Sequence, residues 1–206
     1  MDTDYIGPFI VGFGHRRQVG KDTLAEMVKQ RLFGSVLVER TSFARQLKLA
    51  AYRLFRYAGM QDPDFYDVHP ERREEALYPV MKKTPRQIWI EMGNAMRRIA
   101  PDIWIRNVLD DHPRPRADVL LISDVRYPNE VKAIRDRGGI VVKVVRPGVP
   151  ESDDVADSAL AEMPDKAWDR IVVNDGDKHA LRSKAAAVAR LIVGQVGERD
   201  DLGWEE

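Results

Sequence analysis

The sequence predicts an α/β fold in which a central parallel sheet of about five strands carries helices on both faces. Short apolar runs that suit buried strands alternate with segments whose apolar residues repeat at helical spacing. Of the 206 residues, 44% are hydrophobic and 32% are charged, which excludes a disordered chain of low hydrophobicity. No apolar run approaches the roughly 18 residues of a membrane span. We therefore expect a single domain over residues 1–206.

The strands are expected at residues 9–14, 35–43, 118–124, 140–147 and 170–175. Strands alternate with helical segments along the chain, which is the pattern that produces parallel strands. The helices are expected at residues 22–34, about 44–58, 84–99, 101–109, 129–137 and 178–196. Thr84-Pro85 marks the start of one of them, because threonine is a good N-cap and proline suits the first helical position.

Three segments depart from this alternation. Residues 60–83 are polar, highly charged and contain proline, which predicts a mobile insert with one short helix. Residues 148–169 are acidic and irregular, with a short helix expected near 157–163. Either segment is a candidate lid. Residues 197–206 are expected to form a frayed acidic tail.

Charge and cysteine content limit the partners and the compartment. The 33 basic and 33 acidic residues cancel, so a nucleic-acid-coating surface is not expected, and no membrane partner is expected either. The first 60 residues nevertheless hold 10 basic and 5 acidic side chains, which is compatible with a local anion site. The N-terminus carries Asp2 and Asp4 instead of a basic signal region, and there is no cysteine. We expect a cytoplasmic location, which is the host cytoplasm if the gene belongs to a phage.

Residues 14–23, GHRRQVGKDT, have the context of a phosphate-binding loop, because they follow a strand and precede a helix. The backbone N–H groups of such a loop form an anion nest, and the helix N-terminus adds partial positive charge. Gly20 lets the backbone approach the phosphates, and Lys21 is placed to reach the β- and γ-phosphates of ATP. The other residues expected around ATP in this loop are Gly14, Arg16, Arg17, Val19, Asp22 and Thr23.

The loop departs from the standard pattern at two places. Gly14 and Gly20 enclose five residues instead of four, and the four-residue spacing puts His15 in the first glycine position. Asp22 follows the lysine where serine or threonine usually binds Mg²⁺, and Thr23 comes one residue later. Either residue therefore suits the metal. The alternative interpretation is an ordinary strand-to-helix turn with a surface lysine.

A second site is predicted at residues 120–124, LLISD, where an apolar strand ends in a carboxylate. An aspartate at this place holds the hydration shell of Mg²⁺ or orients the attacking group. Because ligands of parallel sheets bind beyond the carboxyl ends of the strands, Asp124 and the loop are expected to share one crevice. Arg126 is expected to point into it and neutralise phosphate charge; the alternative is a surface arginine in a turn.

Several further polar residues suit an acceptor phosphate or a base edge, although each is equally compatible with a solvated helix face. They are Arg45, Lys48, Arg86, Gln87, Arg97 and Arg98.

The chain resembles the bacteriophage deoxynucleoside monophosphate kinases in a series of motifs that extends over about residues 9–195. The motifs, in order, are GKDTLA at 20–25, SFARQLK at 42–48, TPRQIWIEMGNAMRR at 84–98, PDIWI at 101–105, ISDVRYPNE at 122–130 and VVND at 172–175. The resemblance implies a P-loop kinase fold and the ATP- and Mg²⁺-dependent conversion of deoxynucleoside monophosphates to diphosphates.

The resemblance also implies roles for particular residues. Lys21, Asp124 and Arg126 are the expected catalytic residues, and the metal is assigned to Asp22, Thr23 and Asp124. The residues implied at the adenine end of ATP are Asn174 and Asp175. Those implied near the acceptor or transferred phosphate are Arg45, Lys48, Arg86 and Arg126, and we add Gln87, Arg97 and Glu130 as further substrate-binding candidates.

Two other functions remain open at this point. One is a P-loop kinase of another small acceptor, such as dephospho-coenzyme A. The other is a non-enzymatic nucleotide-binding switch, although residues 174–177 read Asn-Asp-Gly-Asp and do not match the guanine motif Asn-Lys-x-Asp. Base preference, the choice between ribose and deoxyribose, and the oligomeric state, a homodimer included, are also left open.

Overall fold

The computed structural model describes residues 7–77, 80–110, 117–150 and 159–202. The chain divides into two compact units, one formed by residues 1–42 with 113–206 and the other by residues 43–112. The first unit holds the sheet, and the described part of the second is helical. The second unit therefore includes more of the chain than the insert that the sequence predicts over residues 60–83.

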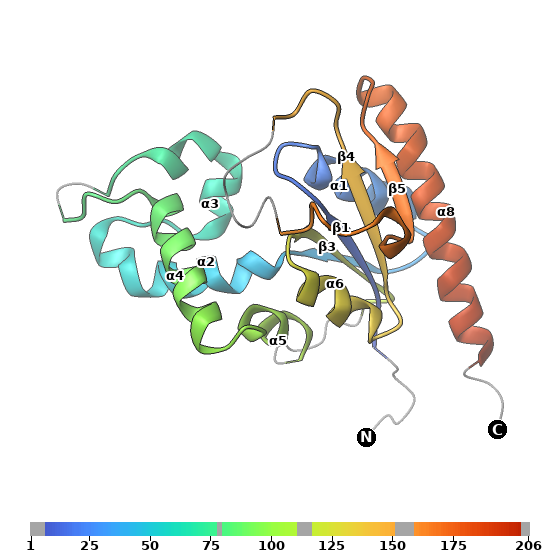
Figure 1. Ribbon diagram of the computed structural model, residues 1–206, viewed down its shortest axis with the longest axis horizontal. Coiled ribbons are helices and arrows are strands. Elements are labelled where there is room, and N and C mark those ends of the chain that lie inside the picture. Colours follow the sequence, from blue (N-terminus) through green and yellow to red (C-terminus); the bar gives the residue numbers. More distant parts are fainter. Residues whose placement is uncertain (1–6, 78–79, 111–116, 151–158, 203–206) are drawn as a thin grey trace. The chain divides into compact units, whose positions relative to one another are not determined.

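The sheet has five strands, all of whose neighbouring pairs are parallel (Figure 1), as the sequence predicts. They lie in the order β2-β3-β1-β4-β5. Their bounds are β1 (Phe9–Gly14), β2 (Val38–Thr41), β3 (Val119–Val125), β4 (Ile140–Val145) and β5 (Arg170–Val173). β2 is shorter than expected because the amides of Ser35 and Val36 bond to the carbonyl of Leu32, so these residues form a turn.

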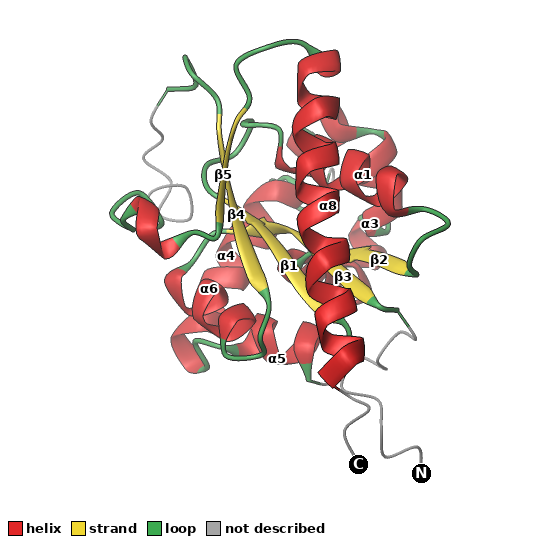
Figure 2. Ribbon diagram, turned by 90° about the vertical axis from the view of Figure 1, so that its right-hand side faces the viewer, coloured by secondary structure: helices red, strands yellow, loops and turns green. Residues whose placement is uncertain are grey.

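Helices cover both faces of the sheet, as predicted (Figure 2). The α-helices among the described residues of this unit are α1 (Lys21–Leu32), α6 (Pro128–Arg135) and α8 (Lys178–Leu202). α1 and α8 pack together on one face. α6 lies on the other, where a Cβ added at Gly12 of β1 would come 2.6 Å from Cδ1 of Ile134. The central strand β1 is buried along its whole length, which explains why its sequence is continuously apolar.

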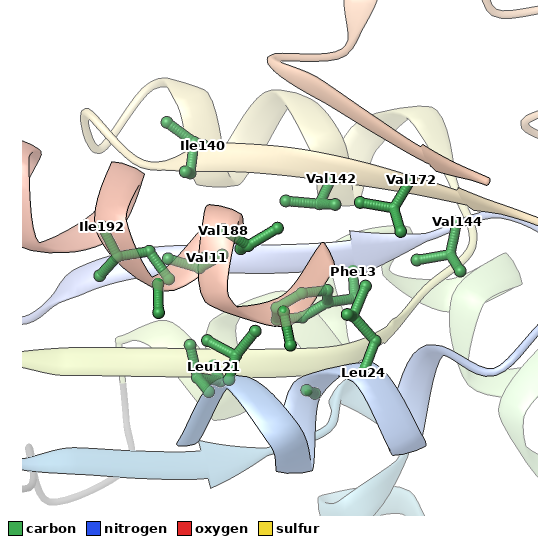
Figure 3. Close-up of a cluster of buried hydrophobic side chains, with 14 of the residues drawn as sticks. Val11, Phe13, Leu24, Leu121, Ile140, Val142, Val144, Val172, Val188 and Ile192 are labelled. Carbon is green, nitrogen blue, oxygen red and sulfur yellow. The ribbon is translucent and has the colours of Figure 1, made fainter. Parts of the chain in front are cut away.

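The main core lies between the sheet and the helices α1 and α8 (Figure 3). Val11, Leu121 and Val142 project from neighbouring strands towards Leu24 of α1 and Val188 of α8, and all five side chains are fully buried. Burial of apolar side chains on this scale is the main term that stabilises a domain. This burial also fixes the position of β1, and therefore the point at which the loop after β1 begins.

The second unit contains four α-helices among its described residues and two 3₁₀ turns. They are α2 (Phe43–Phe55), η1 (Arg56–Ala58), α3 (Pro63–Val68), η2 (Pro70–Glu74), α4 (Pro85–Ile99) and α5 (Ile103–Leu109). The predicted cap of α4 is confirmed: Oγ1 of Thr84 accepts from the Gln87 amide at 3.2 Å. The Thr84 amide in turn donates to Oε1 of Gln87 at 2.9 Å.

Two expectations near the C-terminus need correction. The short helix expected near 157–163 lies partly outside the described residues, and residues 159–163 form turns followed by η3 (Asp165–Ala167). α8 continues to Leu202, so residues 197–202 are helical and not frayed; residues 203–206 lie outside the described part. The Arg199 guanidinium lies 5.6 Å from the ring centre of Phe9, and this contact ties the end of α8 to the start of β1.

None of the helices in the described part of the chain combines the length and the apolar character needed to cross a membrane.

Candidate phosphate-binding site

The loop over residues 15–20 begins at the carboxyl edge of the sheet, between two neighbouring strands. Gly14 is in register with Val125 of β3 and with Lys143 of β4. Within the loop, His15, Gln18 and Gly20 have positive φ angles of 104°, 61° and 96°. Left-handed residues among right-handed ones are the backbone pattern of anion nests. His15 adopts the conformation that suits glycine, so the four-residue spacing, with His15 in the first glycine position, is the one that describes this loop.

Other side chains closely approach Gly14, which precedes the loop, and Gly20, which ends it. A Cβ at Gly14 would lie 2.8 Å from Cζ3 of Trp168. A Cβ at Gly20 would lie 2.6 Å from Nδ2 of Asn174, and the φ of Gly20 is left-handed as well. Each glycine thus lets the loop pack against the segment that leads into or out of β5.

Lys21 is the first residue of α1, and its side chain lies back on the loop. The residue is only 5% exposed. Its Nζ donates to the carbonyl of His15 at 2.9 Å and also to the carbonyl of Arg16. The N-cap of α1 is Gly20, which has no side chain to bond the first-turn N–H groups. The helix therefore presents a buried ammonium group and its partly positive end at the same place.

The carboxylate of Asp22, in the first turn of α1, reaches the end of β3. Oγ of Ser123 donates to Oδ1 of Asp22 at 2.8 Å, and Asp124 follows Ser123 in β3. This bond brings Asp22 to the end of β3, while the guanidinium of Arg40 lies 3.8 Å from the same carboxylate oxygen. Thr23 is exposed on the helix. Among the residues that the structure describes, no group of three or more His, Asp or Glu side chains is arranged to hold a metal ion.

His15 is half-buried beside this loop, and its environment is unfavourable for a positive charge. Burial, together with the charges of Lys143, Arg16 and Lys21, lowers the pKa of His15 to about 4, although a hydrogen bond to the backbone of Val144 opposes this shift. Nδ1 is buried and finds no hydrogen-bond partner in the described part of the chain. The imidazole is therefore neutral near pH 7 and adds no charge to the loop.

Glu130 fixes the turn that presents Arg126. It is only 2% exposed, and one of its carboxylate oxygens accepts from the amides of Arg126 at 2.7 Å and Tyr127 at 3.1 Å. The sequence motif that contains both residues is thus explained by a local contact, because the carboxylate holds the backbone between β3 and α6. The direct contact with substrate expected of Glu130 stays a prediction.

The two residues expected at the adenine end have different environments. Asn174 is only 7% exposed, and its Nδ2 donates to the carbonyl of Val19 at 2.9 Å. Asp175 is exposed and accepts a hydrogen bond from Lys184, which lowers the pKa of its carboxyl group. Asn174 therefore contacts the loop over residues 15–20, whereas Asp175 lies on the surface and bonds Lys184 of α8.

The acceptor-side candidates Arg45, Lys48, Arg86, Gln87 and Arg97 all belong to the second unit, on α2 and α4. Arg45 bonds Asp64 at 2.9 Å and lowers the pKa of that carboxyl group. Lys48 lies 3.8 Å from Asp67 and 5.3 Å from the ring centre of Trp89. Arg86 pairs with Glu74, and Gln87 is part of the α4 cap. Their role toward substrate stays a prediction.

Two residues of the site have no role in the sequence-based predictions. Ser123 holds Asp22 at the end of β3 by a hydrogen bond, and the ring of Trp168 packs against Gly14. A serine before a strand-terminal aspartate is a usable signal for the first. Nothing in the local sequence signals the second, because Trp168 meets the loop only through the fold.

Comparison with known proteins found no matching family model. A protein of Acanthamoeba polyphaga mimivirus, named "Putative deoxynucleotide monophosphate kinase", is 29% identical over 182 residues, which are 81% of this chain and 88% of the viral protein. The resemblance to deoxynucleoside monophosphate kinases is confirmed. The relation to the bacteriophage enzymes in particular stays a prediction, since this relative comes from a mimivirus.

Among solved structures, the shikimate kinase from Acinetobacter baumannii in complex with shikimate matches with a TM-score of 0.39 and 13% identity. The match covers 91% of this chain and 94% of that enzyme. The assignment of the fold rests on the sheet order and on the position of the loop, not on this likeness.

Proposed function

We propose that this protein transfers the γ-phosphoryl group of ATP to a deoxynucleoside 5′-monophosphate, forming ADP and a deoxynucleoside diphosphate. The observation that carries the proposal is the buried ammonium group of Lys21 on the carbonyls of His15 and Arg16, at the N-terminus of α1. The name of the mimivirus relative supports the choice of acceptor.

On the donor side, the phosphates of ATP bind the loop between β1 and α1. Phosphate oxygens replace the loop carbonyls as partners of Lys21, whose charge neutralises part of the charge on the transferred group. The first turn of α1 and the left-handed loop residues add backbone N–H donors, which are in place before the nucleotide binds. Such donors need little reorganisation during transfer.

The donor atoms beside the loop suit Mg²⁺. Asp22 and Asp124 offer carboxylate oxygens, and Mg²⁺ commonly needs only one or two of these because waters and substrate phosphates complete its shell. We assign the protein ligand after Lys21 to Asp22, because Ser123 holds this carboxylate at the end of β3. When bound, the ion would neutralise negative charge on the β- and γ-phosphates.

On the acceptor side, the reaction requires no general base. A phosphate monoester has its second pKa near 6, so the attacking oxygen is mostly ionised at neutral pH. The protein must instead hold two anionic groups in line and offset their repulsion. Arg126, on the turn that Glu130 fixes, supplies a guanidinium group for this purpose, with the planar fork that matches phosphate oxygens.

The test uses the purified chain with ATP, Mg²⁺ and the four common deoxynucleoside monophosphates and their ribonucleotide equivalents, one at a time. Separation of the nucleotides by chromatography should show a diphosphate that increases with ADP in a one-to-one ratio. Dephospho-coenzyme A and shikimate serve as comparison acceptors, because each accepts phosphate on a hydroxyl group instead of on a phosphate monoester.

Two results would contradict the proposal. One is transfer to one of these hydroxyl acceptors without any transfer to a nucleoside monophosphate. The other is ADP formation that does not depend on an acceptor. Lys21→Met is the matched inactive variant, which excludes a contaminating kinase. A homodimer, the absence of nucleic-acid binding and a cytoplasmic location stay predictions.

A further inference from the structure

Asn174 connects two parts of the first unit that are distant in sequence. It directly follows β5, and its own amide donates to the carbonyl of Val145 at 2.6 Å, which ties its backbone to the end of β4. Its side chain is buried and donates from Nδ2 to the carbonyl of Val19, 155 positions earlier. The side chain thus bonds the sheet edge to the phosphate loop.

This contact acts on one particular peptide group of the loop. The carbonyl of Val19 and the N–H of Gly20 belong to the same planar peptide, so a partner that holds the carbonyl also sets the direction of the N–H. Gly20 has a φ of 96°, and a Cβ at this position would lie 2.6 Å from Nδ2 of Asn174. The amide of Asn174 therefore packs directly against the residue that must be glycine.

We propose that Asn174 is a positioning residue of the phosphate loop, which orients the Val19–Gly20 peptide so that the loop is ready for the phosphates of a bound nucleotide. In this role it does not contact the adenine, which is the contact that the resemblance implies. The inference rests on the proposed function only in taking the ligand of the loop to be a polyphosphate.

A hydrogen bond held in place before binding lowers the cost of ordering the loop around the ligand. Without it, the Val19–Gly20 peptide can rotate, and binding must select the productive orientation. Loss of one neutral hydrogen bond of this kind corresponds to a decrease of about five- to tenfold in the affinity for the phosphate ligand. In Asn174→Asp the donor is replaced by a carboxylate of the same size, so repulsion from the carbonyl of Val19 and from the phosphates adds to the loss.

The experiment measures the binding of ATP, inorganic tripolyphosphate and adenosine by calorimetry in the presence of Mg²⁺. Asn174→Ala should weaken the binding of ATP and of tripolyphosphate by the same factor, about five- to tenfold, and leave the affinity for adenosine unchanged. Asn174→Asp, which keeps the packing, should weaken both phosphate ligands further. If ATP is weakened while tripolyphosphate is not, Asn174 acts on the adenosine part and the inference is wrong.

Asp169→Ala is the matched control at the opposite end of β5. Oδ2 of Asp169 accepts from the amide of Val141 at 2.8 Å, so this side chain also links β5 to β4. Its Oδ1 accepts from Arg135 of α6 and not from a residue of the loop. The control should lower the unfolding temperature without changing either affinity. If the Asn174 variants behave in the same way, the residue is merely structural and the inference fails.

These readouts need no acceptor, which separates the inference from the proposed function. A wild-type protein that phosphorylates no nucleoside monophosphate, but whose tripolyphosphate binding depends on Asn174, would overturn the proposed function and support the inference. If the wild type transfers phosphate to nucleoside monophosphates and the Asn174 variants bind tripolyphosphate as tightly as it does, the proposed function is supported and the inference is overturned. Failure of the wild type to bind tripolyphosphate would refute the inference.

Discussion

Replacement of His15 by asparagine should remove part of the pH dependence of stability. The pKa of His15 is about 4 in the folded protein, against an ordinary value of 6.5. The unfolded chain therefore binds more protons than the folded one between these values, and this destabilises the folded state as the pH falls from 6.5 towards 4. Above pH 6.5 the two states are equally deprotonated and the effect vanishes. Asparagine tolerates the left-handed conformation at this position and does not titrate.

The size of the effect follows from the gap between the two pKa values. At about 1.4 kcal/mol per pH unit, the gap between 6.5 and about 4 corresponds to about 3 kcal/mol at its full extent. His15 is only half-buried, so solvent screens the charges that act on it, and we discount the figure to about 1 kcal/mol. Burial is the largest cause of the shift, with Lys143 next.

The assay is urea unfolding followed by circular dichroism, at about pH 7.5 and pH 4.5. The wild type should lose about 1 kcal/mol more of its unfolding free energy than His15→Asn between the two conditions. His179→Asn, at an exposed position near the start of α8, is the control and should follow the wild type. If His15→Asn retains the whole pH dependence of the wild type, the explanation through His15 is wrong.

The remaining predictions concern the loop, the metal and the turn after β3. Lys21→Met should fold normally but lower phosphoryl transfer by about 10²–10³, measured by diphosphate formation; near-normal turnover would contradict the loop assignment. Gly20→Ala should cost about 1–3 kcal/mol of stability in urea unfolding, because its φ is left-handed and its Cβ meets Asn174. Asp124→Asn should raise the Mg²⁺ concentration needed for half-maximal turnover more than it weakens ATP binding; an unchanged Mg²⁺ titration would assign the metal to Asp22 alone. Glu130→Ala should lower the unfolding free energy by about 2–4 kcal/mol, since two backbone N–H groups lose their shared acceptor, and an unchanged urea midpoint would show that water replaces it.

Local sequence determined the elements of this protein and the position of its candidate phosphate loop. Strands β1, β3, β4 and β5 contain short apolar runs, whereas β2 (Val38–Thr41) includes Glu39 and Arg40. Thr84-Pro85 starts α4 by a cap that needs only neighbouring residues. Gly20-Lys21 after a buried strand likewise marks the loop without knowledge of the fold. These features are readable because hydrophobic periodicity and capping depend on residues close together in the chain.

Tertiary structure decided which residues complete the site. Asn174 meets Val19 across 155 positions, and Ser123 meets Asp22 across 101, because parallel pairing brings the ends of β1, β3 and β5 to one edge of the sheet. The contact of Arg199 with Phe9 likewise holds α8 beyond the point where its local sequence suggests fraying. Such contacts depend on strand order and register, which single-chain periodicity does not encode. The left-handed backbone of His15 in the first glycine position is also a product of the folded loop, since histidine by itself favours other conformations.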